Sequence, residues 1–334
     1  MHIQYIIKRV LQMIPIMIII TIIVFFVIQL PPGDFLATYM AERELQGGYV
    51  MEASEVEALR ERFGLDRPIH EQYIMWMSNI ILRGDLGRSF FWNMPVNDIV
   101  SLRLAGTIAI SLGTLIFIWA VSIPIGIYSA THQYSKGDYI FTFIGFIGQA
   151  IPAFLIALVA IYLVFITTGV AVSGLFSSEF TTEPWSFAKI LDMMPRLFLV
   201  IFIIGLSGTA GMIRTTRAMM LDELGKQYVV TARAKGVEEH KLIYKYPVRM
   251  AINPLISTIG ASLGGLISGE TVVSIVFNLP TTGPILFRSL LIQDMYLAGG
   301  FLLIMSIFVV IGTFISDIML SVLDPRIRYG GVIE

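Results

Sequence analysis

The sequence predicts an all-α polytopic membrane protein with six transmembrane helices and both termini in the cytoplasm. Of its 334 residues, 56% are hydrophobic and only 14% are charged, and its mean hydropathy is +0.78. A soluble domain has about 25% charged residues. Charge-free stretches of about 20 residues, the length that one membrane crossing needs, also recur along the chain.

The composition also excludes several classes of function. A formal net charge of −1 argues against nucleic acid as a partner. The chain has no cysteine, and therefore neither a disulfide framework nor a thiolate site. Its histidines are His2, His70, His132 and His240. They are scattered without the spacing of metal ligands, so no metal site is expected.

The first span is expected from Val10 to Gly33, a stretch without a charge. Its length and the lack of a small-residue cleavage site favour a retained span over a signal peptide. A polar segment follows at residues 31–103, long enough to form an outward-facing domain. We expect a helix around Glu52–Arg62 in this segment and a tight turn where Gly84 and Gly87 stand.

Five more spans follow from the charge-free stretches. They are expected at Leu104–Thr131, at Tyr139 to about Thr167 with a bend at Pro152, at Leu197–Ile213 and past Arg214, at Ala251–Phe277, and at Leu297–Ser316. Outward loops are expected after Thr167, as far as Pro195, and at Leu279–Pro284. The predicted organisation has three parts: residues 1–30 with the N-terminus and first span, residues 31–103, and residues 104–334 as a five-span core.

Charge sets the predicted orientation. The segments assigned to the inside carry Lys8, Arg9, Lys136, eight bases of the long loop, Arg326 and Arg328. The short outward loops after residue 167 carry only Lys189, Arg196 and Arg288. Because Lys and Arg accumulate on the cytoplasmic side of short loops, both termini are expected inside.

The long inner loop at residues 217–250 is the most informative stretch of the core. Eight Lys/Arg lie between Arg214 and Arg249, against four acids. Within it, small residues precede Gly236, which suits the left-handed position that ends a helix. Glu238 and Glu239 then favour the start of a second helix, where negative charge is stabilised. We expect a helix, a sharp turn and a short helix over Lys226–Tyr246, here called the elbow.

The elbow resembles the "EAA" loop of ABC-importer permeases of the dipeptide, oligopeptide and nickel branch. The core Ala232-Arg233-Ala234-Lys235-Gly236 and the following Asn253-Pro254 carry the resemblance, whereas Val230 and Thr231 stand where the general motif has Glu and Ala. Further blocks match in order. They are Pro32-Gly33-Asp34, Phe63-Gly64-Leu65-Asp66-Arg67-Pro68, Gln72-Tyr73, Arg83-Gly84-Asp85-Leu86-Gly87-Arg88-Ser89 and Asp324-Pro325-Arg326.

This resemblance implies the translocation subunit of an ATP-driven importer for peptides or related small solutes in a bacterial or archaeal inner membrane. It implies a heterodimer with a second permease, two ATP-binding subunits inside and a substrate-binding protein outside. The elbow would be the coupling helix that docks into the ATPase. The residues implied in coupling are Tyr228, Ala232, Arg233, Ala234, Lys235, Gly236, Val237 and Glu238.

The permease itself is expected to be no enzyme and to bind no cofactor, with ATP and Mg on the partner ATPases. No G-x4-G-K-[ST] phosphate loop is present, because the pair Gly225-Lys226 is followed by Gln. Motifs of other hydrolases are absent from the sequence as well.

Candidate residues of the pathway are Gln149, Pro152, Gly208, Ser268 and Glu270. Glycine recurs at 205, 208 and 211, and at 260, 264, 265 and 269, which predicts helix faces that approach closely. Glu270 is the one acid well inside an expected span, and an intramembrane ionisable residue is a functional candidate. Two alternatives remain open: an ion-gradient-driven secondary transporter that uses Glu270, and a membrane scaffold or sensor without transport.

Overall fold

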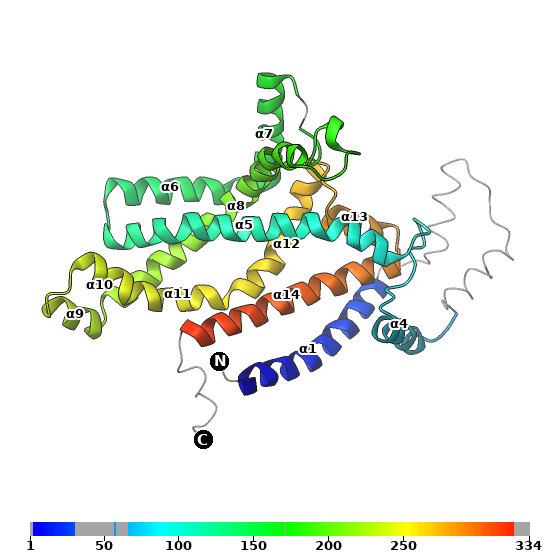
Figure 1. The fold of residues 1–334 in the computed structure, drawn as a ribbon, viewed down its shortest axis with the longest axis horizontal. Coiled ribbons are helices and arrows are strands. Elements are labelled where there is room, and N and C mark those ends of the chain that lie inside the picture. Colours follow the sequence, from blue (N-terminus) through cyan, green and yellow to red (C-terminus); the bar gives the residue numbers. More distant parts are fainter. Residues whose placement is uncertain (1–2, 31–56, 58–65, 171, 324–334) are drawn as a thin grey trace. The chain divides into compact units, whose positions relative to one another are not determined.

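The computed structural model describes residues 3–30, 57, 66–170 and 172–323. In these ranges the chain forms α-helices, a short 3-10 helix at Ser178–Phe180 and one isolated bridge between Arg88 and Pro95 (Figure 1). This confirms the predicted all-α fold.

Five helices are long and apolar enough to cross a membrane, and a bent pair makes a sixth candidate span. The five are α1 (Ile3–Gln29), α5 (Val96–Thr131), α8 (Phe187–Leu224), α12 (Ile259–Val276) and α14 (Met295–Leu323). The pair consists of α6 (Lys136–Ala150) and α7 (Ala153–Thr168). The shorter helices are α4 (Ile69–Arg83), α9 (Gln227–Ala234), α10 (Glu239–Lys245), α11 (Pro247–Ser257) and α13 (Thr282–Leu291).

The runs of β-branched residues in these spans are helical in spite of their low helix propensity. Ile18 to Val24 of α1, for example, holds six Ile or Val residues and one Thr. In hydrocarbon every backbone N–H and C=O must be satisfied within the segment, and the helix achieves this. The membrane therefore outweighs the intrinsic preference of these residues for strands.

Two compact units make up the chain. The first unit comprises Met1–Val10, Thr107–Pro280 and Phe308–Glu334, and the second comprises Leu11–Gly106 and Thr281–Ile307. The predicted three-part organisation remains a prediction.

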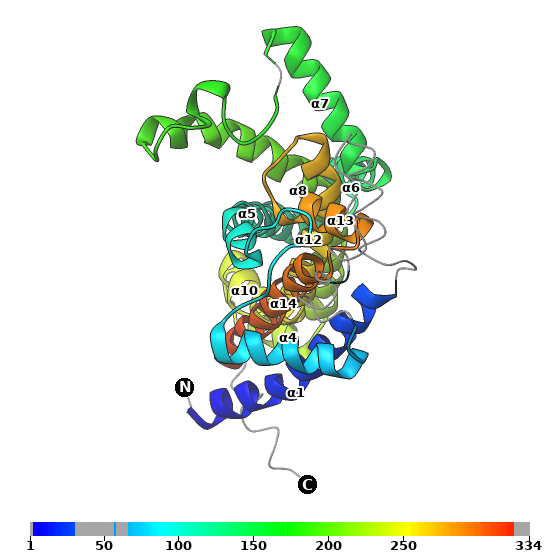
Figure 2. The same cartoon turned by 90° about the vertical axis from the view of Figure 1, so that its right-hand side faces the viewer.

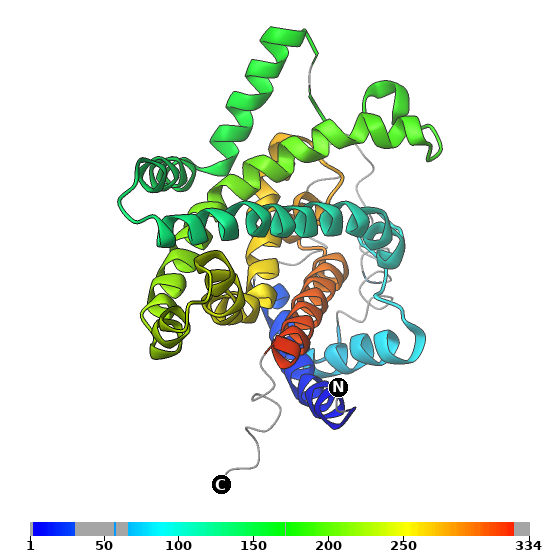
Figure 3. The same cartoon turned by 60° about the vertical axis from the view of Figure 1, so that its left-hand side comes forward.

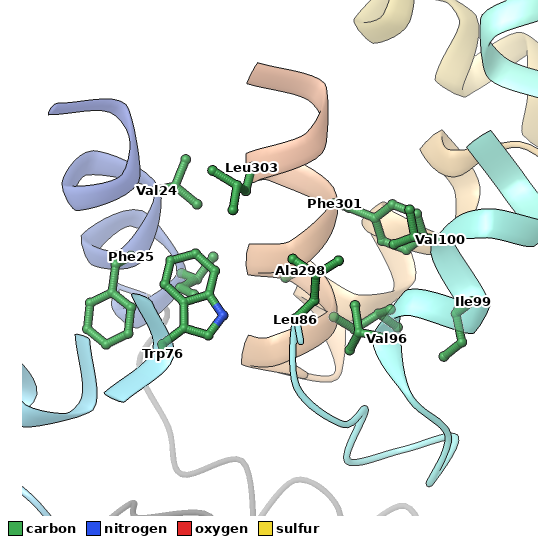
Figure 4. Close-up of a cluster of buried hydrophobic side chains, with 12 residues drawn as sticks. Val24, Phe25, Trp76, Leu86, Val96, Ile99, Val100, Ala298, Phe301 and Leu303 are labelled. Atoms are coloured by element: carbon green, nitrogen blue, oxygen red, sulfur yellow. The ribbon is translucent and has the colours of Figure 1, made fainter. Parts of the chain in front are cut away.

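A cluster of twelve buried apolar residues forms the core of the second unit (Figure 4). Phe25 of α1 and Trp76 of α4 lie with their ring centroids 5.8 Å apart. On α14, a Cβ added to Gly299 would lie 3.2 Å from the Trp76 ring, so the absence of a side chain there lets the indole approach. Gly84 ends α4 in the left-handed conformation with a φ of +65°, and Gly87 has a φ of +97°, so both glycines of the predicted turn have positive φ.

A buried polar contact holds the same unit together. Asp294, fully buried at the start of α14, accepts hydrogen bonds from the Ser89 hydroxyl at 2.5 Å and the Phe91 and Leu297 amides at 3.2 Å each. Burial raises the pKa of the Asp294 carboxyl, and these bonds oppose that rise. Ser89 is the last residue of the sequence block Arg83–Ser89, so this hydrogen bond fixes the block to the start of α14.

In the first unit, glycines bring three pairs of helices together. A Cβ on Gly208 of α8 would lie 3.3 Å from Ile118 Cγ1 of α5, and a Cβ on Gly148 of α6 would lie 2.9 Å from the Leu206 oxygen of α8. On α12, a Cβ on Gly260 would lie 2.7 Å from the Thr313 amide nitrogen of α14.

Figure 2 shows α7 leaving the end of α6 at a steep angle, which measures 95°.

Several helices extend beyond the predicted spans. Helix α1 starts at Ile3, before the predicted start of the span at Val10, and contains Arg9, whose guanidinium pairs with Asp317 of α14 at 3.1 Å. The chain bends at Pro152, as predicted, and the bend is a break between α6 and α7 of 95°, because proline has no N–H for a helical bond. Helix α8 begins at Phe187, within the outward loop that was expected up to Pro195, and Pro195 lies inside this helix.

The remaining differences concern short helices. The expected span Ala251–Phe277 is divided at Thr258 into α11 and α12, and Thr282 starts α13 in the expected loop Leu279–Pro284. The polar segment 31–103 contains α4, which the sequence did not predict. The helix expected around Glu52–Arg62 falls outside the described residues except for residue 57.

Candidate functional site

The elbow consists of α9, a glycine turn and α10, as the sequence predicts (Figure 3). Gly236 has a φ of +78°, and its amide donates to the Arg233 oxygen at 3.0 Å. The Val237 amide then donates to the Ala232 oxygen at 3.3 Å. These bonds satisfy carbonyls at the end of α9 in the way that a left-handed terminal residue allows. A Cβ on Gly236 would meet no atom within 4 Å, so the glycine is required by conformation and not by space.

Three buried side chains form the interior of the elbow. Val229 and Ala232 of α9 pack against Leu242 of α10, and Val237 and Tyr246 cover them. The small side chain of Ala232 suits this close packing. Its neighbours Ala234, Lys235 and Gly236 are exposed at the turn.

Ion pairs on the outside tie the two short helices to each other. Arg233 donates to both carboxylate oxygens of Glu239, at 3.0 and 2.6 Å, and Lys241 lies 2.8 Å from Glu238. The hydrogen bond from Arg233 lowers the pKa of Glu239, and the same bond raises the pKa of Arg233. Arg233 is therefore engaged within the elbow. Lys235 makes no ion pair with any described residue.

Tyr228 connects the elbow to the end of α8. Its hydroxyl donates to Glu223 at 2.5 Å, and its ring centroid lies 6.4 Å from that of Tyr246. Burial raises the pKa of the Tyr228 phenol, and the hydrogen bond to the Glu223 carboxylate raises it further. The phenol thus stays protonated as a donor to Glu223.

Both ends of the elbow are fixed to spans of the first unit. Met220 of α8 packs with Val248 and Ala251 of α11 and with Ile127 of α5 in one buried cluster. Arg249 also donates to the Leu323 oxygen at the end of α14, at 3.2 Å. A displacement of the elbow would therefore act on α5, α8, α11 and α14 together.

A cavity of about 320 Å³ lies in the same unit, and Gly208 is part of its lining. Helices α5, α8, α11 and α12 and Thr258 contribute the lining residues: Leu115, Ile118, Trp119, Gly208, Met212, Thr215, Leu255, Thr258, Ser262, Gly265 and Leu266. This volume is in the range of small-molecule sites. Its lining is apolar with three hydroxyl groups and no charged side chain.

The other expected pathway residues do not line this cavity. Gln149 and Pro152 are exposed, and Gln149 accepts a hydrogen bond from Arg214 at 2.8 Å. Ser268 is exposed and donates to the Gly264 oxygen of its own helix at 3.1 Å. Of the five candidate pathway residues, only Gly208 lines this cavity.

Glu270 is only 1% exposed and connects α12 to α5. Its Oε2 accepts a hydrogen bond from the Ser111 hydroxyl at 3.2 Å, and its Oε1 has no partner among the described residues. A buried carboxyl with one hydrogen-bonded oxygen fits a contact between helices.

Comparison with known families identifies the chain. Residues 122–329 match the family model of the "binding-protein-dependent transport system inner membrane component", and residues 2–111 match the model of the N-terminal region of such membrane components. The chain belongs to this family.

Several relatives match this inner membrane component over almost its whole length. The oligopeptide transport system permease protein AppB of Bacillus subtilis (strain 168) is 34% identical over 97% of this chain and 99% of its own. The dipeptide transport system permease protein DppB of Alkalihalophilus pseudofirmus is 30% identical, covering 97% and 99%. The inner membrane ABC transporter permease protein YejB of Escherichia coli O157:H7 is also 30% identical, covering 98% and 99%.

Among solved structures, a chain of the MetNI methionine ABC transporter covers 67% of this component and 96% of its own length. Its TM-score is 0.48 and its sequence identity 15%, too low for residues to be compared.

Membership defines the protein as a multi-pass inner-membrane permease of an ABC transporter, which works with an ATPase and a binding protein. It is the non-catalytic membrane subunit. No cluster of three metal-binding side chains occurs among the described residues.

Sequence reasoning missed most of the cavity of this component. On α8, Gly208, Met212 and Thr215 lie at intervals of four and three residues, and Ser262 and Gly265 are three residues apart on α12. Such spacing places residues on one helix face. The sequence contains this spacing, but it does not show that the face borders a cavity.

The glycine patterns proved to be of two kinds. Four glycines lie against neighbouring helices, as expected, because a Cβ added to them would contact those helices: Gly205, Gly208, Gly260 and Gly264. Three others face open space, since an added Cβ would have no atom within 4 Å: Gly211, Gly265 and Gly269.

Proposed function

We propose that this chain is the translocation subunit of an ATP-driven importer for peptides. It would form a heterodimer with a second permease and bind two ATPase subunits, which carry ATP and Mg, and an extracytoplasmic binding protein would deliver the substrate. The names of AppB and DppB, which denote oligopeptide and dipeptide transport, support the substrate class.

The observation that carries this proposal is the construction of the elbow. It is internally closed by its small core and ion pairs, and fixed to four helices of the first unit. Closure of the ATPase subunits would move it as a rigid body, and the attached spans would rock between inward-open and outward-open states. The cavity at Gly208 lies between helices that the elbow connects, and would change volume in that motion.

The test is affinity purification of the chain from its native membrane in mild detergent, followed by ATP-dependent peptide uptake in proteoliposomes. We expect two ATPase subunits and a second permease to co-purify. Lys235→Glu reverses an exposed charge at the tip and should reduce the recovered ATPase. Lys136→Glu, the same change at the exposed start of α6, serves as the control. Recovery of the chain alone, while other membrane complexes survive, would overturn the proposal.

The alternative is a secondary transporter in which Glu270 couples solute to an ion gradient. Its supporting observation is the buried carboxyl oxygen without a described partner. If this function were correct, Glu270→Gln would abolish a gradient-dependent uptake that needs no ATP. ATP-dependent uptake that is insensitive to an imposed pH gradient would exclude it.

A further inference from the structure

Two arginines stand one turn apart on α8, and only one of them is neutralised. Arg217 pairs with the buried Asp138 of α6 at 3.2 Å. Arg214 has no carboxylate partner among the described residues, donates to the neutral Gln149 at 2.8 Å and lies over the Phe146 ring at 5.6 Å. It is an exposed cation in a helix long enough to span a membrane. Such residues are costly in hydrocarbon and usually face a polar path or a partner.

The two guanidinium groups point in opposite directions along α6. Asp138 and Gln149 are eleven residues apart on this helix, or roughly 16 Å at 1.5 Å per residue. Arg214 and Arg217 are only three residues apart, roughly 5 Å along α8. Arg217 therefore reaches toward the start of α6 and Arg214 toward its end.

The Arg214 guanidinium lies over the Phe146 ring, and Arg214 lines a small pocket together with Gly145 of α6 and Ala210 of α8. The side chain therefore extends from Arg214 toward the charge-free stretch Leu197–Ile213. An arginine near the end of a span normally extends its head outward to the interface. Because the Arg214 head extends toward the charge-free stretch instead, lipid phosphates, which lie at the membrane surface, are poorly placed to neutralise it.

The chemistry of this pair suits a carboxylate. The Gln149 carbonyl oxygen is occupied by Arg214, which leaves its amide group as a donor, and the guanidinium keeps further N–H groups beyond the one bond to Gln149. Both side chains are exposed, and they offer several donors side by side. A planar guanidinium binds carboxylates through two parallel hydrogen bonds.

We infer that Arg214 and Gln149 bind the C-terminal carboxylate of the peptide during its passage through the membrane. The inference rests on the proposed function, since it requires a peptide as the substrate. Every linear peptide with a free C-terminus carries this group, so the pair would recognise substrates irrespective of their side chains.

The test compares uptake of trialanine and of trialanine amide by the complete reconstituted transporter with its own binding protein. The binding protein is the same in every assay, so a change in the ratio of the two uptake rates must come from the permease. Arg214→Gln should reduce trialanine uptake about tenfold or more, because a charge-assisted double hydrogen bond is lost. Uptake of the amide should stay unchanged. Arg214→Lys should keep part of the preference, and Lys136→Gln, a charge loss at the other end of α6, should keep all of it.

Each outcome decides between explanations. An unchanged ratio in Arg214→Gln, with normal uptake in the unaltered protein, overturns this inference and leaves the proposed function intact. Equal loss of both peptides together with loss of the second permease on purification would assign Arg214 to an acidic residue of that partner, and would also overturn it. If the unaltered transporter moves neither peptide in the presence of ATP, the proposed function itself fails.

Discussion

The elbow and the core of the second unit both hold short segments in place, but they place charged and apolar groups in opposite ways. In the elbow the charged contacts lie on the exposed outside, around three buried side chains, and all partners are within about 20 residues of one another. In the second unit the charged group is inside, since Asp294 accepts from Ser89, 205 positions away in the chain, beside twelve buried apolar residues.

This difference determines whether each region keeps its shape when it is displaced. A module closed by local contacts keeps its shape when it is displaced, which is what transmission of a motion requires. A region closed by contacts between distant segments loses its shape if either segment moves. We therefore expect changes in the elbow to affect transport more than stability, and changes around Asp294 to affect stability first.

Removal of Asp294 should give the largest effect. Asp294→Ala leaves the Ser89 hydroxyl and two backbone amides buried without an acceptor, and each such group costs about 1–3 kcal/mol. The purified complex should therefore lose about 3 kcal/mol or more of stability, measured by thermal unfolding in detergent. Asp98→Ala, which removes an exposed carboxylate from the same unit, is the control. Equal melting temperatures for the two variants would contradict the account of the second unit.

A valine at the turn of the elbow should have an intermediate effect. Gly236→Val forces a β-branched residue into the left-handed region, at a cost of about 1–2 kcal/mol, although space is open around it. We expect normal membrane insertion, measured by fractionation, and strongly reduced ATP-dependent uptake. Gly225→Val makes the same change eleven residues earlier, where φ is −79°. If both variants transport alike, the left-handed turn is not what couples the elbow to transport.

The same contrast explains how much could be predicted from the sequence. The elbow was predictable because its determinants are local: a small-residue helix, Gly236 and the acids Glu238 and Glu239. The apolar helices were predictable, but the residues at which they begin and end were not. Whether a charge may lie inside a helix depends on a distant partner, as Asp317 allows Arg9 in α1.

The lining of the cavity was the least predictable part. Gly208 lines the cavity and Ser268 does not, although each is a small residue in an apolar span. Which face of a helix is open depends on how its neighbours pack, and one sequence does not contain that information. Arg214 was expected at the end of the fourth span and among the bases of the loop, and its hydrogen bond to Gln149, 65 positions away, was not predicted.

The smallest effect is expected for the ion pair on the outside of the elbow. Arg233→Glu places two carboxylates side by side and should loosen the contact between α9 and α10. Because exposed pairs contribute little, uptake should fall by at most about fivefold. Reversal of both charges, Arg233→Glu with Glu239→Arg, restores an attractive pair and should restore most of the uptake if Arg233 acts inside the elbow. If the double variant transports no better than Arg233→Glu alone, Arg233 contacts the ATPase directly. The elbow would then depend on its partner for its shape, and the contrast with the second unit would no longer hold.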